Sequence, residues 1–213
     1  MDPCIELHHV RKEFKETTAL HDIDVGFEKG RIHGIIGRNG SGKTVMLKCI
    51  CGLMKLTSGE ILIDGRQVIP GQAQNIGAII ETPGFIESQS GIKNLEQLAS
   101  LHNRIDKARI IKVLQQVGLQ DVGKKPVHKY SMGMRQRLGI AQAIMESPPL
   151  LILDEPMNGL DNQGVEDMRR LLLSLKAQGT TILLASHNRE DIEILCDTTL
   201  ELDHGKVIKT SNY

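Results

Sequence analysis

Aromatic side chains and net charge are both scarce in this sequence. The 213 residues include three Phe, two Tyr and no Trp, so few rings are available to stack on the bases of single-stranded nucleic acid. The 26 basic and 26 acidic side chains leave a formal net charge of +0, which argues against a basic groove along the whole chain. We therefore expect no nucleic-acid partner.

Long apolar runs, an export signal and paired cysteines are also missing from the sequence. No apolar run approaches the roughly 20 residues that span a bilayer. The opening MDPCIELHHV lacks the basic start and apolar stretch of a signal peptide. The four cysteines form no C-x-x-C pair. We expect them to be reduced, partly buried side chains in a cytoplasmic protein, not a metal or redox site.

The spacing of apolar residues predicts an α/β fold. Partly alternating strands near the start, such as 4–10 and 23–27, are typical of an antiparallel sheet. Apolar strands at 150–153 and 180–185 alternate with amphipathic helices, which is typical of a buried parallel sheet. The helical middle reads as an insertion on that core. The other expected strands are 31–36, 60–64, 76–80 and 200–202, the last leading into a hairpin, and the expected helices are 44–54, about 92–116, about 134–147, 165–175 and 190–195.

A glycine-rich segment, GRNGSGKT at 37–44, carries the strongest chemical signal. It matches G-x-x-x-x-G-K-[ST] and lies between an expected strand and an expected helix, as a phosphate-binding loop does. Glycines let successive backbone N–H groups surround phosphate oxygens, and the helix N-terminus adds a favourable dipole. Lys43 is expected to reach the β- and γ-phosphates, and the Thr44 hydroxyl to ligate Mg²⁺. The predicted nucleotide-binding residues of this loop are Gly37, Asn39, Gly40, Ser41, Gly42, Lys43 and Thr44.

The second signal is LLILDEP at 150–156, an apolar strand that ends in two carboxylates. Ligands bind at the carboxyl ends of parallel strands, so Asp154 is expected to hold the Mg²⁺ shell and Glu155 to orient or deprotonate water. A solvated acidic turn would explain this segment alone, but the phosphate-binding loop upstream favours nucleotide hydrolysis. These two motifs leave small-molecule kinases, GTPases and ATPases open.

A third segment, YSMGMRQRLGIAQAIMESPPLLILDEP at 130–156, separates these classes. It resembles the block of ATP-binding cassette (ABC) proteins that runs from their signature, L-S-G-G-Q, to the acidic strand end. The signature here keeps Ser131 and Gly133 and changes the other three positions. A helix start with these residues suits an anion, although Ser131 would equally cap an ordinary helix. The resemblance implies that Ser131 and Gly133 contact the nucleotide of a partner chain, far from their own phosphate-binding loop.

Further matches spread the resemblance over nearly the whole chain. The segment Asn158-Gly159-Leu160-Asp161 looks like the family's D-loop, which adds Asp161 to the nucleotide site. His187 directly follows an apolar strand and Ser186, and looks like the switch histidine that contacts the γ-phosphate. Phe14 lies where the family has its adenine-stacking aromatic residue. The alternative for Phe14 is a place in the core.

One position departs from the family pattern. ABC proteins usually have Gln after the strand that precedes the helical insertion, and this sequence has Glu81 in IIETPGF. In the family that Gln touches Mg²⁺ and the attacking water and relays to the membrane partner. Glutamate can ligate Mg²⁺ but adds negative charge beside the phosphates, so the expected metal set is Thr44, Asp154 and Glu81. IIETPGF, YSMGMRQR and SHNREDIE together resemble the bacitracin- and lantibiotic-type exporter subgroup.

The resemblance implies the ABC ATPase fold. This is a P-loop NTPase core with a parallel sheet, an antiparallel β section at the N-terminus and a helical insertion. A single nucleotide-binding domain would span 1–213, with its core at 1–80 and 148–213 and a helical subdomain at about 81–147. ATP and Mg²⁺ would be the cofactors, and Glu155, His187 and Lys43 the catalytic residues.

The resemblance also implies partners and a location. The chain would form a homodimer on ATP binding, and separate transmembrane permease subunits would carry a drug or antimicrobial peptide outward. It would be cytoplasmic, held on the inner face of the cell membrane through the permease alone. One alternative is a soluble ABC ATPase that acts on the ribosome or DNA, although 213 residues leave no room for a second cassette. Another is an inactive nucleotide-binding scaffold, against which the intact Lys43, Asp154, Glu155 and His187 argue.

Overall fold

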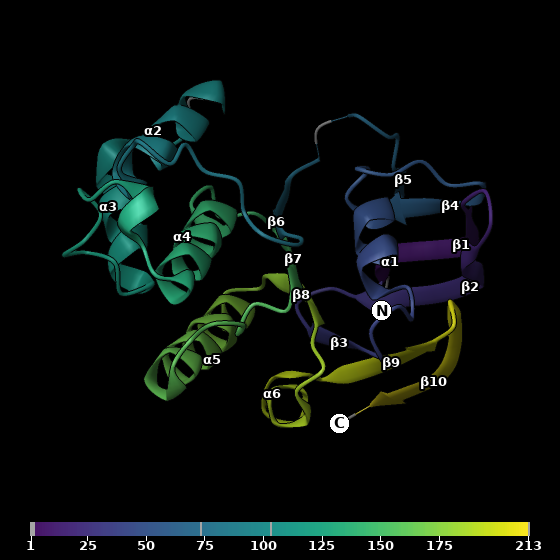
Figure 1. Ribbon diagram of the computed structural model, residues 1–213. Coiled ribbons are helices and arrows are strands. Elements are labelled where there is room, and N and C mark those ends of the chain that lie inside the picture. The colour runs from purple at the N-terminus through teal and green to yellow at the C-terminus, as the bar shows by residue number, and fades with distance from the viewer. Residues whose placement is uncertain (1–2, 73, 103, 213) are drawn as a thin grey trace.

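An antiparallel sheet is built from the first part of the chain (Figure 1). The computed structural model describes residues 3–72, 74–102 and 104–212. The alternation of the first strand is only partial because His9 and Asp22, on neighbouring strands, both have left-handed backbone at φ 49° and 52°, where the pairing shifts register. The expected antiparallel section is confirmed. In the order β2-β1-β4-β5, its strands are β1 (Pro3–Glu13), β2 (Thr18–Glu28), β4 (Ser58–Ile63) and β5 (Arg66–Gln67).

The second sheet has six strands in the order β10-β9-β3-β8-β7-β6. Neighbours from β9 to β6 run parallel, and β10 returns antiparallel to β9, so the expected parallel sheet and final hairpin are confirmed. Parallel strands bring their carboxyl ends to one edge of the sheet. The strands are β3 (Ile32–Ile36), β6 (Ile76–Ile79), β7 (Leu150–Asp154), β8 (Thr181–Ala185), β9 (Thr198–Asp203) and β10 (Lys206–Asn212).

The helices lie on both sides of the six-stranded sheet. Figure 1 shows α1 between the two sheets, and α2, α3 and α4 gathered on the far side of β6 and β7. None of the helices of the described residues is long and apolar enough to cross a membrane. The helices are α1 (Lys43–Ile50), α2 (Gly91–His102), α3 (Lys107–Gln116), the short η1 (Val127–Lys129), α4 (Met132–Ile144), α5 (Asn162–Ala177) and α6 (Arg189–Leu195).

Strand β7 shows how the core is divided into two halves. Leu151 and Leu153 pack in one buried cluster with residues of α2 to α6. Leu150 and Ile152 point to the opposite face, into a cluster with β1, β2 and α1. A strand buried on both faces reads as a continuous apolar run. This is why 150–153 was recognisable as a strand of a covered parallel sheet.

Strands β1 and β2 extend beyond their expected ranges, and two expected helical segments have other bounds. Helix α1 ends at Ile50 and not at Met54, because Gly52 adopts φ 69°, the left-handed conformation that terminates helices. The expected helical stretch 92–116 is two helices, and the Asp106 side chain begins the second by accepting a hydrogen bond from the Arg109 N–H. Residue 103, within that stretch, lies outside the described residues.

Candidate active site

The phosphate-binding loop joins β3 to α1, as the sequence predicts. Gly42 caps α1 with φ 106°, and a Cβ there would lie 2.6 Å from the Ala19 carbonyl oxygen. Only glycine satisfies both the left-handed backbone and the close approach. Within the loop, Ser41 is buried and its Oγ has no hydrogen-bond partner among the described residues. The loop therefore presents a backbone and a hydroxyl shaped for an anion at a helix N-terminus.

Lys43 is folded back onto its own loop. Its Nζ donates hydrogen bonds to the Gly37 carbonyl at 2.6 Å and the Arg38 carbonyl at 3.2 Å. The side chain is only 7% exposed, so its ammonium is held by backbone oxygens at the mouth of the loop. A phosphate that enters the loop meets a cation already in place.

The first turn of α1 is tied to the end of β7. The Thr44 hydroxyl donates to Asp154 Oδ2 at 2.7 Å. Asp154 is the last residue of β7 and is buried. The two residues are 110 positions apart in the chain, and the parallel pairing of β3, β8 and β7 brings their elements together. A hydroxyl and a carboxylate oxygen in contact are the kind of hard donors that Mg²⁺ prefers.

Glu155 and His187 meet at the carboxyl ends of β7 and β8. Glu155 has left-handed backbone at φ 51°, and its N–H donates to the Ala185 carbonyl at 2.9 Å. His187 Nδ1 lies 2.8 Å from Glu155 Oε1. A carboxylate only accepts hydrogen bonds, so Nδ1 carries the hydrogen. The strained backbone turns Glu155 away from the continuing strand direction and toward the histidine.

A cavity of about 590 Å³ brings most of the predicted residues together. The phosphate-binding loop from Asn39 onward forms one wall, with Asp154 and Glu155 beside it. Glu81 lines the same cavity, with φ 62° and an ion pair to Lys48 at 2.7 Å. The predicted residues that line this cavity are Asn39, Gly40, Ser41, Gly42, Lys43, Thr44, Glu81, Asp154 and Glu155.

The start of α4 carries the signature residues. Ser131 is exposed and its Oγ accepts a hydrogen bond from the Met134 N–H at 3.2 Å, so it caps the helix. A Cβ on Gly133 would lie 2.7 Å from the Gly159 carbonyl, which keeps this position small. Met132 and Arg135 line the cavity of the chain's own phosphate-binding loop. The helix start is thus nearer to that loop than we expected from the resemblance.

A protein-family model described as "ABC transporter" matches residues 20–158 of this chain. The chain is also 40% identical over 205 residues to an uncharacterized ABC transporter ATP-binding protein, YybJ of Bacillus subtilis (strain 168), covering 95% of this chain and 94% of that protein. This chain belongs to the ABC transporter family. It is an ATP-binding subunit of that family, an ABC ATPase.

Other relatives of this ABC ATPase carry transport names. It is 40% identical over 216 residues to the bacitracin transport ATP-binding protein BcrA of Enterococcus faecalis, covering 100% of this chain and 70% of that protein. It is 35% identical over 209 residues to the lantibiotic transport ATP-binding protein SrtF of Streptococcus pyogenes, covering 98% of this chain and 91% of that protein.

Solved structures share the fold. The ATP-binding subunit of an ABC transporter superposes with a TM-score of 0.89 at 27% identity, covering 98% of this chain and 90% of that one. A dimeric bacterial ABC transporter cassette, MJ0796, gives a TM-score of 0.90 at 24% identity, covering 98% of both chains. The expected ABC ATPase fold is confirmed.

Six predicted residues do not line the cavity of the phosphate-binding loop: Phe14, Gly37, Ser131, Gly133, Asp161 and His187. Phe14 is 45% exposed with the Lys12 ammonium 5.0 Å from its ring centre, so it is a surface aromatic and not a core residue. Asp161 caps α5 by accepting a hydrogen bond from the Gly164 N–H at 2.8 Å. Gly37 lines the second cavity described below.

Gln136 is a site residue that the sequence reasoning did not single out. Its side-chain amide on α4 donates to the Pro156 carbonyl at 3.1 Å, directly after Glu155. It therefore links the signature helix to the backbone that carries the candidate catalytic carboxylate. Its position in Arg135-Gln136-Arg137, immediately after the signature, is the feature of the sequence that could have indicated a site role.

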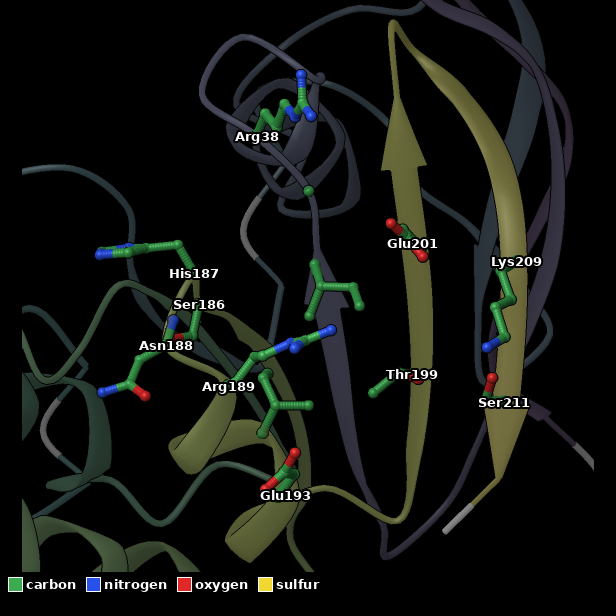
Figure 2. Close-up of a pocket in the computed structure, with 13 residues that line it drawn as sticks. Arg38, Ser186, His187, Asn188, Arg189, Glu193, Thr199, Glu201, Lys209 and Ser211 are labelled. Atoms are coloured by element: carbon green, nitrogen blue, oxygen red, sulfur yellow. The ribbon is translucent and has the colours of Figure 1, made fainter.

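A second cavity of about 590 Å³ is lined by the segment 186–189, which includes His187, and by residues of β9 and β10. Figure 2 shows Arg189 and Glu193 of the α6 segment facing Glu201 of β9 and Lys209 of β10. The His187 ring points away from this cavity. Because its charged side chains are of both signs, the cavity favours neither an anion nor a cation.

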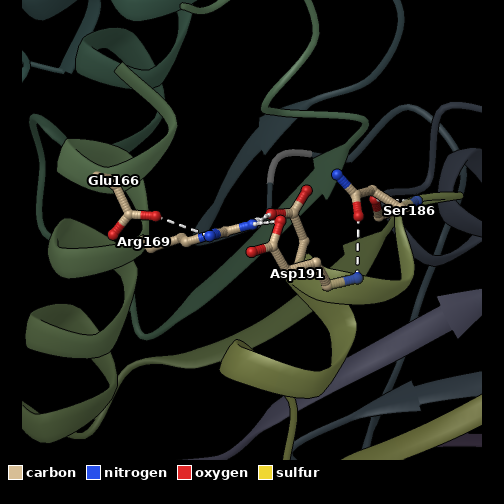
Figure 3. A network of polar contacts seen from close by, with 6 residues as sticks. Glu166, Arg169, Ser186 and Asp191 are labelled. Carbon is tan, nitrogen blue, oxygen red and sulfur yellow. Dashed lines mark hydrogen bonds and ion pairs between the residues drawn. The ribbon is translucent and has the colours of Figure 1, made fainter. Parts of the chain in front are cut away.

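A buried ion pair joins α5 to α6 (Figure 3). Arg169 Nη2 lies 2.6 Å from Asp191 Oδ1, and the side chains are 6% and 1% exposed. Arg169 also reaches Glu166 at 2.7 Å. Helix α6 begins two residues after His187, so this pair holds the helix that follows His187.

The four cysteines lie in structural positions. All are free, and Cys4, Cys49 and Cys196 are buried. Burial raises the pKa of Cys49 to about 11 and the pKa of Cys196 to about 12. Because the thiolate is the reactive form, these thiols are poor nucleophiles and metal ligands at neutral pH.

Proposed function

We propose that this ABC ATPase forms a homodimer on ATP binding and drives export of a drug or antimicrobial peptide through separate permease subunits. The observation that carries the proposal is its 40% identity over 216 residues to a bacitracin transport ATP-binding protein. The chain would lie at the inner face of the cell membrane, attached through the permease alone. The subgroup resemblance of IIETPGF, YSMGMRQR and SHNREDIE supports the same cargo class.

The donor set fits Mg²⁺. Thr44 Oγ1 and Asp154 Oδ2 are already in contact at 2.7 Å, and the Glu81 carboxylate lines the same cavity. The unpartnered hydroxyl of Ser41 and the loop backbone suit phosphate oxygens. Thr44, Asp154 and Glu81 would hold the ion. When bound, Mg²⁺ neutralises charge on the β- and γ-phosphate oxygens.

Glu155 and His187 form the proposed hydrolytic pair. Glu155 orients water and accepts its proton, while the Nδ1–H of His187 holds the carboxylate at 2.8 Å. The other ring nitrogen, Nε2, can donate to a phosphate oxygen only when it too carries a hydrogen. We assign the γ-phosphate contact to His187.

The exposed start of α4 supports the shared-site dimer. Ser131 is exposed, Met132 is 69% exposed, and a helix N-terminus attracts anions. We assign Ser131 and Gly133 to the phosphates bound by the partner chain. Asp161 and Phe14 complete the proposed nucleotide contacts.

Reconstitution tests this function. The full chain would be co-expressed with a candidate six-helix permease from its own genome, captured through the permease, and assayed for phosphate release in vesicles with and without bacitracin or a lantibiotic. Capture of the ATPase and a rise in phosphate release with the peptide would support export. Capture on ribosomes or DNA, with no binding to the permease, would favour the soluble alternative and contradict the proposal.

A further inference from the structure

Lys48 lies one helical turn after Thr44 on α1. Residues four apart on a helix share one face, so the helix that presents Thr44 to Asp154 also presents Lys48 to Glu81. Lys48 Nζ donates to Glu81 Oε1 at 2.7 Å. The side chains are 26% and 63% exposed. The pair therefore sits at the rim of the nucleotide cavity, where water and ligand both reach it.

The Glu81 carboxylate adds negative charge to a cavity that already contains two carboxylates, and Lys48 offsets that charge. Three carboxylates, those of Glu81, Asp154 and Glu155, line the cavity that takes a polyphosphate. Of the cations nearby, Lys43 is tied to loop carbonyls and Arg135 is paired with Glu87 through Nη2 at 2.7 Å. Lys48 is the cation that contacts the Glu81 carboxylate. A glutamine at position 81 would need no such partner.

We propose that Lys48 is a positioning residue that neutralises Glu81 and holds it at the rim of the cavity, so that nucleotide phosphates can enter past an added carboxylate. The inference rests on the proposed nucleotide site, whose cavity Glu81 lines, and not on the Mg²⁺ shell. Exposed ion pairs add little to folding stability, and this one links α1 to the segment after β6. It adjusts charge at the site and contributes little to holding the fold together.

The test is a double-mutant cycle on nucleotide binding. Lys48→Met, Glu81→Gln and the double variant would be titrated with ADP by calorimetry, first with a chelator and then with excess Mg²⁺. ADP avoids hydrolysis during the measurement. In the chelator arm, Lys48→Met should weaken ADP binding roughly threefold to tenfold, from the repulsion of one uncompensated charge. The same change in the Glu81→Gln background should have no effect on affinity.

Salt and a matched lysine supply the controls. The loss in Lys48→Met should shrink at high ionic strength, since exposed charges are screened. Lys112→Met removes one positive charge from the exposed face of α3 and should leave ADP affinity unchanged. Lys48→Arg, which keeps the charge, should bind ADP as the unaltered chain does. If Lys48→Met proves unstable in a thermal melt, Lys48→Gln enters the same cycle.

Two results would overturn the role of Lys48. One is an unchanged ADP affinity in Lys48→Met; the other is an equal loss in the presence and absence of Glu81, which would mean that Lys48 acts on nucleotide or helix directly. The chelator arm decides this without any metal. If excess Mg²⁺ leaves the ADP affinity of every variant unchanged, the proposed Mg²⁺ shell is wrong. That outcome does not affect the conclusion about Lys48.

Discussion

The imidazole of His187 lies against the carboxylate of Glu155, with Nδ1 2.8 Å from Oε1. His187 follows β8 and Glu155 follows β7, two neighbouring strands of the parallel sheet. The histidine side chain is 64% exposed and the glutamate 22%. The pair therefore lies at the carboxyl edge of the sheet, where Glu155 lines the cavity of the phosphate-binding loop and His187 faces solvent.

Glu155→Gln should leave nucleotide binding intact and lower ATP turnover by roughly 10²–10⁴-fold, the range for loss of a general base. The amide keeps the shape of the side chain and loses the charge that orients water. Phosphate release measures turnover, and size-exclusion chromatography with ATP and Mg²⁺ should show a shift from monomer to dimer. Glu60→Gln changes an exposed residue of β4 in the same way; this matched control should hydrolyse ATP normally. Normal turnover in Glu155→Gln would remove Glu155 from the mechanism.

Ser131→Arg should abolish ATPase activity while changing ATP affinity little in dilute, monomeric protein. The long side chain would fill the proposed dimer seam at the exposed start of α4. Mixing this variant with Lys43→Ala should restore part of the activity, because a mixed dimer has one site with both defects and one intact site. The readout is phosphate release across mixing ratios.

The geometry of α4 sets the condition that would contradict this shared site. Met132 and Arg135 line the cavity of their own chain, so loss of ATP binding in monomeric Ser131→Arg would point to action within one chain. Absence of any recovery under conditions where mixed dimers form would lead to the same conclusion. A thermal melt of Ser131→Arg checks the loss of the helix cap, which costs about 0.5–2 kcal/mol.

Arg169→Met should destabilise the fold by about 3–5 kcal/mol, because it leaves the Asp191 carboxylate buried without its cation. Asp191 is 1% exposed, and its Oδ2 already lacks a hydrogen-bond partner among the described residues. Urea unfolding measures the change. Arg170→Met is the neighbouring control: its side chain is 70% exposed, so the cost should be about 0–1 kcal/mol. Equal costs for the two arginines would show that the buried pair is not what holds α6.

His33 should make the protein less stable in mild acid. Its ring lies 2.7 Å from the Thr198 hydroxyl and 2.8 Å from the Glu28 carbonyl, and burial lowers its pKa from 6.5. The unfolded chain therefore binds a proton at His33 more readily than the folded chain does. The contribution of neutral His33 to the free energy of unfolding is fully present above pH 6.5 and is lost as the pH falls below that value. Melting temperatures measured from about pH 7.5 down to about pH 5.5 should fall less in His33→Gln than in the unaltered chain. Parallel pH profiles would contradict the assignment.

The local chemistry of the site could be predicted from the sequence because it depends on short segments. GRNGSGKT has its glycines, lysine and threonine within eight consecutive positions, and LLILDEP carries its carboxylates directly after an apolar strand. Strand pairing then placed Thr44 beside Asp154, as parallel topology requires. The helix end at Ile50 was missed, since an apolar run continues past Gly52 and only the backbone conformation of that glycine ends the helix.

The ion pairs in and near the site depend on the tertiary structure. Lys48 and Glu81 are 33 residues apart, and Arg169 and Asp191 are 22 apart. Their charges are visible in the sequence, but charged residues are common and most stand on solvated faces. Which of them meet depends on the angle at which α1 packs against β7, the neighbour of β6, and α5 against α6. That angle is set by the buried apolar side chains of the whole core, and no short segment of the chain contains it.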